Sequence, residues 1–106
     1  YMEARLVNWV PGEVGQIMVR FPVEGSESNE LHIHPLSDRI ILVIEGSGEF
    51  VSIRDGVEVR HALQPGDCIY LPRGTRHTFF AGPLGLLVES IHNPWVPLED
   101  PQCLVY

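Results

Sequence analysis

Three histidines in two separated segments are the residues of this sequence that could bind one metal ion together. His32 and His34 lie two residues apart in the stretch LHIHP, and His77 ends the turn sequence LPRGTRH. If LHIHP is extended, alternate side chains share a face, and the two imidazoles lie roughly 6 to 7 Å apart. A third imidazole from a neighbouring strand would complete three nitrogen ligands for a divalent transition metal, with positions left open for water or substrate. The alternative for each of these histidines, taken alone, is that it is a polar residue on a solvated strand face.

Short apolar runs separated by turns must position these histidines. The chain has 10 glycines and 9 prolines, which fall between runs rich in Val, Ile, Leu, Phe and Tyr. Apolar runs separated by turn residues in this way are typical of an all-β domain, and in no segment do the apolar residues have the spacing of a helix. We expect eight strands, at residues 16–21, 31–34, 39–45, 48–54, 57–63, 68–71, 75–80 and 86–92. Eight short strands at this spacing favour a double-sheet jelly roll or a small barrel.

The length of 106 residues suits a single domain with its own hydrophobic core. Residues 1–15 are interpreted as an N-terminal arm. Residues 93–106 form a tail whose three prolines exclude a regular helix or a central strand. We expect this tail to lie over the barrel surface or across a partner subunit. A barrel of this length has exposed edges that pairing would cover, which favours a homodimer.

The charge balance disfavours two classes of partner. Seven arginines and no lysine stand against 14 acidic residues, for a formal net charge of -7. Nucleic-acid binding and polybasic membrane binding both need a positive patch, so neither is expected. No apolar run reaches the roughly 18 to 20 residues that span a bilayer.

Cys68 and Cys103 form no CxxC pair, and free thiols in a reducing cytoplasm are the expected state. The sequence shows no leader at its start, which agrees with this interpretation.

The order of these turns and histidines resembles the two motifs of the cupin superfamily, over roughly residues 25–80. The segment HIHPLSDRIILVIEG matches the first motif, and GDCIYLPRGTRHTFFA matches the second. The matching positions are His32, His34 and Gly46 in the first segment, and Gly66, Pro72, Gly74 and His77 in the second. The resemblance implies a double-stranded β-helix barrel whose interior holds a metal on the three histidines.

Two positions depart from the family motifs. Arg39 stands where the family has a glutamate, and Ala81 stands where it has an asparagine. A guanidinium stays protonated and has no free lone pair, so Arg39 cannot ligate a metal. Asp38 could replace the glutamate only if a bulge shifted the strand register. If Arg39 points inward, it is a candidate to orient a substrate carboxylate through a two-pronged contact; if it points outward, it is a surface arginine paired with an acid.

Further residues are candidates to line the pocket. Phe79 lies two residues after His77 and is expected to share its face. Tyr70 is a second candidate lining residue. Glu89 could enter the barrel as a ligand, a hydrogen-bond acceptor for a ligand or a base, or it could face solvent. His92, near the end of the last strand, is expected at the rim.

Three functions from different classes fit these residues. The first is a metal-dependent, dioxygenase-like enzyme that holds Fe, Mn, Ni or Zn on the three histidines and acts on an anionic small molecule oriented by Arg39. The second is a non-catalytic ligand-binding or sensor module, which the departures at Arg39 and Ala81 motivate. The third is a metal-free isomerase or epimerase with His77 or Glu89 as the base. Because a fold does not fix chemistry, the sequence leaves the three open.

Overall fold

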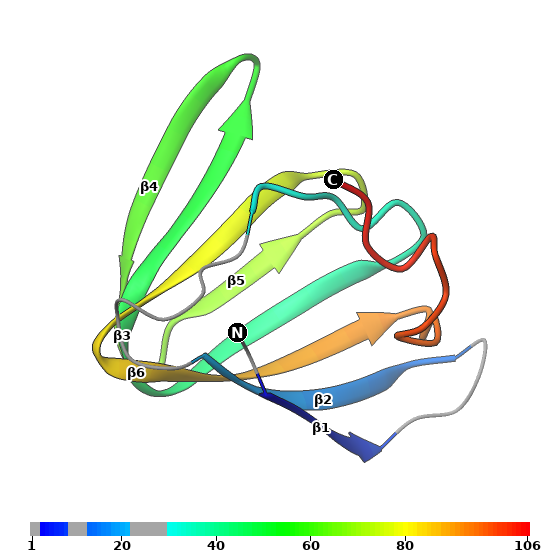
Figure 1. Ribbon diagram of the computed structural model, residues 1–106, viewed down its shortest axis with the longest axis horizontal. Coiled ribbons are helices and arrows are strands. Elements are labelled where there is room, and N and C mark those ends of the chain that lie inside the picture. The colour runs from blue at the N-terminus through cyan, green and yellow to red at the C-terminus, as the bar shows by residue number, and fades with distance from the viewer. Residues whose placement is uncertain (1–2, 9–12, 22–29) are drawn as a thin grey trace.

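Two long strands, β3 and β6, form the centre of the computed structural model (Figure 1). The structure describes residues 3–8, 13–21 and 30–106. In these ranges every regular element is a strand, and the all-β prediction is confirmed. The strands are β1 Glu3–Asn8, β2 Gly15–Phe21, β3 Asp38–Arg54, β4 Val57–Leu63, β5 Cys68–Leu71 and β6 Arg76–Asn93.

All strand pairs are antiparallel, and the sheet order is β1-β2-β6-β3-β4. β5 pairs with the first half of β3, on the edge opposite β6. The first half of β3 pairs with the second half of β6, and the second half of β3 pairs with the first half of β6. Between these halves the β3 register shifts twice, at Val43/Glu45 and at Gly46/Gly48. Each bulge bends the strands, so the sheet folds over and its two halves face each other. This arrangement is the double-stranded β-helix that the motifs implied.

Gly46 makes the bend between the two halves possible. Its φ angle is +93°, which L side chains rarely adopt. A Cβ atom at this position would lie 2.1 Å from the carbonyl oxygen of Gly85 on β6. The glycine that closes the first motif is therefore required both by its own conformation and by the approach of the neighbouring backbone.

The observed strands differ from the predicted ones in three ways. The segments 39–45 and 48–54 join into β3, and 75–80 and 86–92 join into β6, because a bulge bends a strand without ending its pairing. Residues 31–34 form only two isolated bridges, at His32 and Ile33. The expected N-terminal arm contains β1, which pairs with β2; residues 9–12 of this arm lie outside the described part of the chain.

The core lies between the two halves of the folded sheet. Burial alternates along the strands, so that on β2 Ile17, Val19 and Phe21 point inward while Arg20 is exposed. The buried cluster is formed by Ile17, Val19, Phe21, Ile41, Val43, Phe50, Leu63, Leu71, Phe79, Leu86, Val88 and Trp95. These residues come from both layers, and they fix β6, which carries His77.

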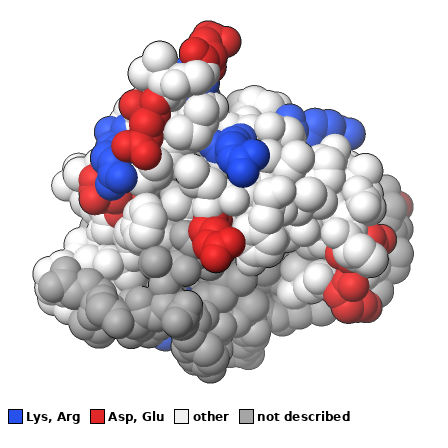
Figure 2. Space-filling view, turned by 45° about the horizontal axis from the view of Figure 1, so that its top comes forward, with Lys and Arg blue, Asp and Glu red and all other residues white. Residues whose placement is uncertain are grey.

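The β3–β4 hairpin projects away from the barrel and carries charges of both signs (Figures 1 and 2). On it Arg60 contacts Glu58 at 3.0 Å and Glu49 at 3.7 Å, with all three side chains about half exposed. Exposed pairs of this kind contribute little to stability. No helix in the described ranges is long and apolar enough to cross a bilayer.

Candidate metal centre

Backbone pairing brings the three histidines together. His32 and His77 exchange two backbone hydrogen bonds, from His32 N to His77 O at 3.0 Å and from His77 N to His32 O at 2.9 Å. The carbonyl oxygen of His34 accepts a bond of 3.0 Å from Gly74 N, in the turn that precedes His77. Directly opposed residues of an antiparallel pair point their side chains to the same face. The extended LHIHP segment therefore delivers both of its imidazoles to the face that carries the third.

The three rings form a compact, buried cluster. Their side chains are almost fully buried, with exposed fractions of 5% for His32, 7% for His34 and 2% for His77. The ring centroids lie 5.0 Å apart for His32 and His34, 4.5 Å for His32 and His77, and 5.0 Å for His34 and His77. One nitrogen from each ring lies within 4.8 Å of the other two. The chain offers three nitrogen donors to a single ion.

Each imidazole is oriented by a hydrogen bond to the backbone. The Nδ1 atoms of His32, His34 and His77 lie 2.6 Å from Glu30 O, 2.9 Å from Cys103 O and 2.9 Å from Thr75 O, respectively. A carbonyl oxygen only accepts, so each Nδ1 carries the proton and each Nε2 keeps its lone pair. Bonds of this kind fix the tautomer and ring orientation of metal-binding histidines. The donor set fits a divalent transition metal.

Burial keeps these rings neutral. Desolvation lowers the pKa of His34 to about 2 and that of His77 to about 4, and it also lowers the pKa of His32. The positive charge of Arg39 adds to the shift in all three. A neutral imidazole binds metal without first losing a proton, so at neutral pH the site is ready for an ion.

We expect the stability of the metal-free protein to fall as the pH is lowered from about 7 toward 4. Burial lowers the pKa of His92 to about 3, and His34 and His77 are shifted in the same direction. These rings have a pKa near 6.5 when unfolded, so below that pH the unfolded chain binds more protons than the folded one. Each such ring lowers the free energy of unfolding by up to about 1.4 kcal/mol per pH unit, and its loss levels off only near its own folded pKa, about 4 for His77 and about 3 for His92. Urea unfolding between pH 7.5 and 4.5 measures this slope.

Two variants control the pH experiment. His92→Phe removes one buried titrating ring and should reduce the slope, whereas His61→Gln alters an exposed ring on β4 and should leave it unchanged. A free energy of unfolding that stays constant over this range would show that the buried rings have the same pKa in the folded and the unfolded chain.

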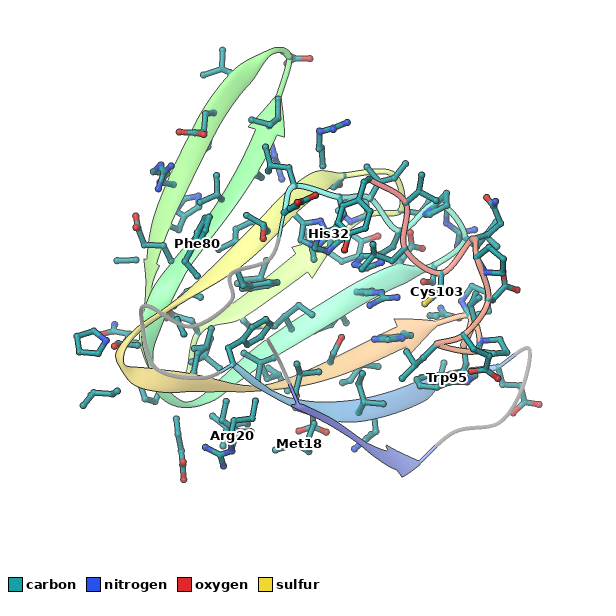
Figure 3. The ribbon with its side chains drawn as sticks, viewed as in Figure 1. Met18, Arg20, His32, Phe80, Trp95 and Cys103 are labelled. Carbon is teal, nitrogen blue, oxygen red and sulfur yellow. The ribbon has the colours of Figure 1, made fainter. Side chains whose placement is uncertain are left out.

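The histidines open into a cavity of about 190 Å³ between the two halves of the sheet. At about 30 Å³ for each water molecule, this volume holds about six waters, or a metal and a ligand of a few heavy atoms. One wall is the C-terminal tail, which supplies Leu98, Cys103 and Leu104. The tail is anchored by the pairing of Val105 with Ile33, and Figure 3 shows Cys103 on it beside the barrel. Of the two places expected for the tail, the structure thus shows the one on its own barrel.

Arg39 points into this cavity. Its side chain is 8% exposed, and its Nη2 lies 3.5 Å from Cys103 Sγ. Asp38, one residue earlier, points the other way, and both of its oxygens pair with Arg73 at 3.1 Å. A bulge that would make Asp38 a ligand is therefore not formed, since the β3 register first shifts beyond Val43. The cavity gains a cation where the family motif has a carboxylate.

Aromatic rings form the inner wall beside the histidines. Phe79 lines the cavity, and its ring centroid lies 6.0 Å from that of His77. Phe50 lies 5.9 Å from His77 and 5.1 Å from Phe79, and Phe21 lies 5.8 Å from Phe79. These rings make the surroundings of the three nitrogens apolar.

Two of the predicted lining residues lie elsewhere. Tyr70 is 60% exposed because β5 turns Ile69 and Leu71 inward, and it borders a separate hollow beside β4. Glu89 lies on the outer face of β6, where its Oε1 accepts a hydrogen bond of 2.6 Å from Gln16 Nε2. Both predictions are wrong for the same reason, since neighbouring strand residues face opposite sides.

Two groups near the cavity were not found from the sequence. His92, expected at the rim, is fully buried; its Nε2 lies 2.8 Å from Ser90 Oγ, and its ring stacks on Trp95 at 5.1 Å. Ser90 lines the cavity. The available signal was strand alternation, which puts Ser90 and His92 on the same face as Val88. Cys103 is the second group; it reaches the cavity from an irregular tail that carries no periodic signal.

Comparisons with known proteins agree with this geometry. Residues 18–85 match the model of the family described as the cupin domain. An acireductone dioxygenase from Leishmania major is 35% identical over 81 residues, which are 74% of this chain. The chain spans only 22% of that protein's length.

Solved structures show the same fold. KdgF from Halomonas sp. superposes with a TM-score of 0.74 at 25% identity, over 90% of this chain and 82% of its own. A recombinant oxalate oxidase in complex with glycolate gives a TM-score of 0.76 at 22% identity, over 91% of this chain and 52% of its own. At that identity the oxalate oxidase shows a shared architecture and no more.

Proposed function

The chain belongs to the cupin domain family, and on that premise we propose that it is a metal-dependent, dioxygenase-like enzyme acting on a small anionic molecule. The observation that carries this proposal is the cluster of three buried imidazoles, each with its Nδ1 bonded to a backbone carbonyl, so that three Nε2 lone pairs remain for one ion. A relative named as an acireductone dioxygenase, 35% identical over 81 residues, supports the proposal.

His32, His34 and His77 would hold the ion, and the remaining residues of the cavity would hold the substrate. A bound Fe, Mn, Ni or Zn ion would supply Lewis acidity and, in the case of iron, reactivity toward dioxygen. Arg39 would orient a substrate carboxylate through its guanidinium N–H groups. Phe21 and Phe79, which line the cavity, would keep water away from the reacting end.

The charge of the cavity favours an anionic substrate. No aspartate or glutamate is among the described residues that line it, whereas Arg39 is. Three neutral imidazoles leave the two charges of a bound ion uncompensated, and Arg39 adds a third positive charge. A mono- or dicarboxylate would balance this charge in a low-dielectric site, where Coulomb interactions are strong.

Oxygen uptake tests the proposal. The iron-loaded chain would be mixed with a panel of small hydroxy acids, keto acids and dicarboxylates in an oxygen electrode, with anaerobic samples and His34→Ala as controls. We expect substrate-dependent uptake in the wild type alone. Metal bound without turnover of any member of the panel would favour the second candidate, a ligand-binding module, which the cation in place of the family glutamate also supports.

A homodimer in the cytoplasm completes the proposal. β4 is paired on one edge only in the described part of the sheet, and Val57 on it and Tyr70 on β5 are 61% and 60% exposed. Both cysteines are free thiols, which suits a reducing compartment. Light scattering of the wild type and of Val57→Glu would show whether this edge joins two copies.

A further inference from the structure

Arg39 is a buried cation whose hydrogen-bonding capacity is largely unused. In the described ranges of the chain, its one polar contact is the long one of Nη2 with Cys103 Sγ at 3.5 Å, and its buried Nε has no partner. None of the ion pairs formed by these residues includes it. A buried guanidinium without a carboxylate is costly, because burial removes its hydration and nothing replaces it. No anion among the described residues neutralises this side chain, so its N–H groups are available to an anion that binds in the cavity.

A second polar pair lies directly beside this cation. Arg39 on β3 is opposite His92 on β6 in the sheet register, and Ile41 is opposite Ser90. Ser90 Oγ and His92 Nε2 are 2.8 Å apart, with exposed fractions of 3% and 0%. Ser90 lines the same cavity as Arg39 and the three histidines, whereas His92 lies behind it and stacks on Trp95.

The charge of Arg39 selects the tautomer of His92. His92 Nδ1 is buried and has no hydrogen-bond partner. A lone pair on Nδ1 is favourable near the guanidinium, whereas an N–H there would turn its positive end toward a cation and would also be a buried donor without an acceptor. The proton therefore sits on Nε2 and is donated to Ser90 Oγ. Burial and the charge of Arg39, which lower the pKa of His92 to about 3, keep the ring in this neutral form.

This tautomer leaves the hydroxyl hydrogen of Ser90 free. Because Ser90 Oγ already accepts from His92, its own O–H can be donated into the cavity. We infer that Ser90 and Arg39 together form a carboxylate subsite at the end of the cavity, with His92 as the positioning residue that turns the Ser90 hydroxyl into a donor.

The inference rests on the proposed function and deepens it, because it defines the class of substrate. One end of the ligand is a carboxylate held by Arg39 and Ser90, and the other end carries an oxygen donor for the metal. The small cavity limits the ligand to a few heavy atoms. Short 2-hydroxy acids and short dicarboxylates meet these requirements.

Glycolate and its neutral isostere glycolamide provide the test. Binding of each to the 106-residue chain would be followed by calorimetry, with and without one equivalent of zinc. A hydrogen bond to a charged group is worth about tenfold or more in affinity, so we expect Ser90→Ala to weaken glycolate by about that factor and to change glycolamide much less. Ser90→Thr keeps the hydroxyl and should restore most of the affinity.

Ser52→Ala is the matched control. Ser52 is also a buried serine, 3% exposed; it is opposite His77 in the sheet register, but it borders the separate hollow beside β4 and lies outside the proposed subsite. The inference is overturned if Ser90→Ala leaves glycolate binding intact, or if it weakens both ligands equally, as a general disturbance of the cavity would. Zinc titration of the same proteins separates the two proposals: a wild type that binds glycolate but no zinc contradicts the metal-dependent function and leaves the subsite standing.

Discussion

Replacing His77 by alanine should lower the affinity of the protein for zinc or cobalt by at least about 100-fold. Loss of an outer hydrogen-bond partner of a metal-binding histidine already costs 10- to 100-fold, and loss of a ligand costs more. His77 is 2% exposed, and its ring centroid lies 4.5 Å from that of His32 and 5.0 Å from that of His34. Calorimetric titration of the metal-free protein with the metal salt measures the effect.

His61→Ala is the control for this experiment, because His61 is exposed on β4 and lies outside the cluster. Its metal affinity should equal that of the wild type. Unfolding curves of both variants show whether the fold is kept, and His77→Gln provides a larger replacement if the alanine variant is unstable. Equal affinities in the two alanine variants would contradict a site built on His77.

Replacing Arg39 by methionine should change the two affinities in opposite directions. Glycolate binding to the zinc-loaded protein should weaken by about 100-fold, since hydrogen bonds between charged groups are the strongest available and a two-pronged contact doubles them. Metal affinity should rise by about tenfold, because the variant lacks a buried positive charge near the ion. The same charge contributes to the lowered pKa values of all three histidines.

Arg60→Met separates this effect from a general loss of charge. Arg60 lies on the projecting hairpin and pairs with Glu49 and Glu58. Its replacement should leave both affinities unchanged. If Arg39→Met weakened metal and glycolate binding together, Arg39 would support the architecture of the cavity and would not recognise an anion.

The proximity of the three histidines could be predicted from the sequence because it depends on short-range rules. Strand alternation puts His32 and His34 on one face, and the Pro72-x-Gly74 turn returns the chain so that His77 pairs with His32. Both rules act within a few residues, and the motif resemblance supplied the pairing between the two segments.

The direction of Arg39 could not be predicted, because the strand that carries it is apolar on both faces. In the run RIILVI, Ile41 and Val43 are 4% and 2% exposed, whereas Ile40 and Ile44 are 39% and 40% exposed. Hydrophobicity does not show which of the two alternating sets of residues faces the core, and only the assembled sheet decides this. The misplacement of Glu89, in the run LLVES, has the same cause.

The contact of the C-terminal tail with the histidine cluster could not be predicted from the sequence for a different reason. Cys103 places its carbonyl oxygen 2.9 Å from His34 Nδ1, across 69 positions of the chain. The segment that carries it has no regular structure and no periodic pattern, so its place depends on where prolines and turns direct it. An orienting contact for a ring of the histidine cluster is therefore visible only in three dimensions.

X-ray absorption at the zinc or cobalt edge of the loaded wild type tests the three-histidine centre most directly. We expect three imidazole nitrogens at about 2.0 to 2.1 Å from the metal. The remaining ligands should be oxygen atoms that are displaced when glycolate binds. A sulfur atom at about 2.3 Å from the metal would show that Cys68 or Cys103 binds it instead. That result, or the failure of the metal-free protein to take up one equivalent of metal, would contradict the centre formed by His32, His34 and His77.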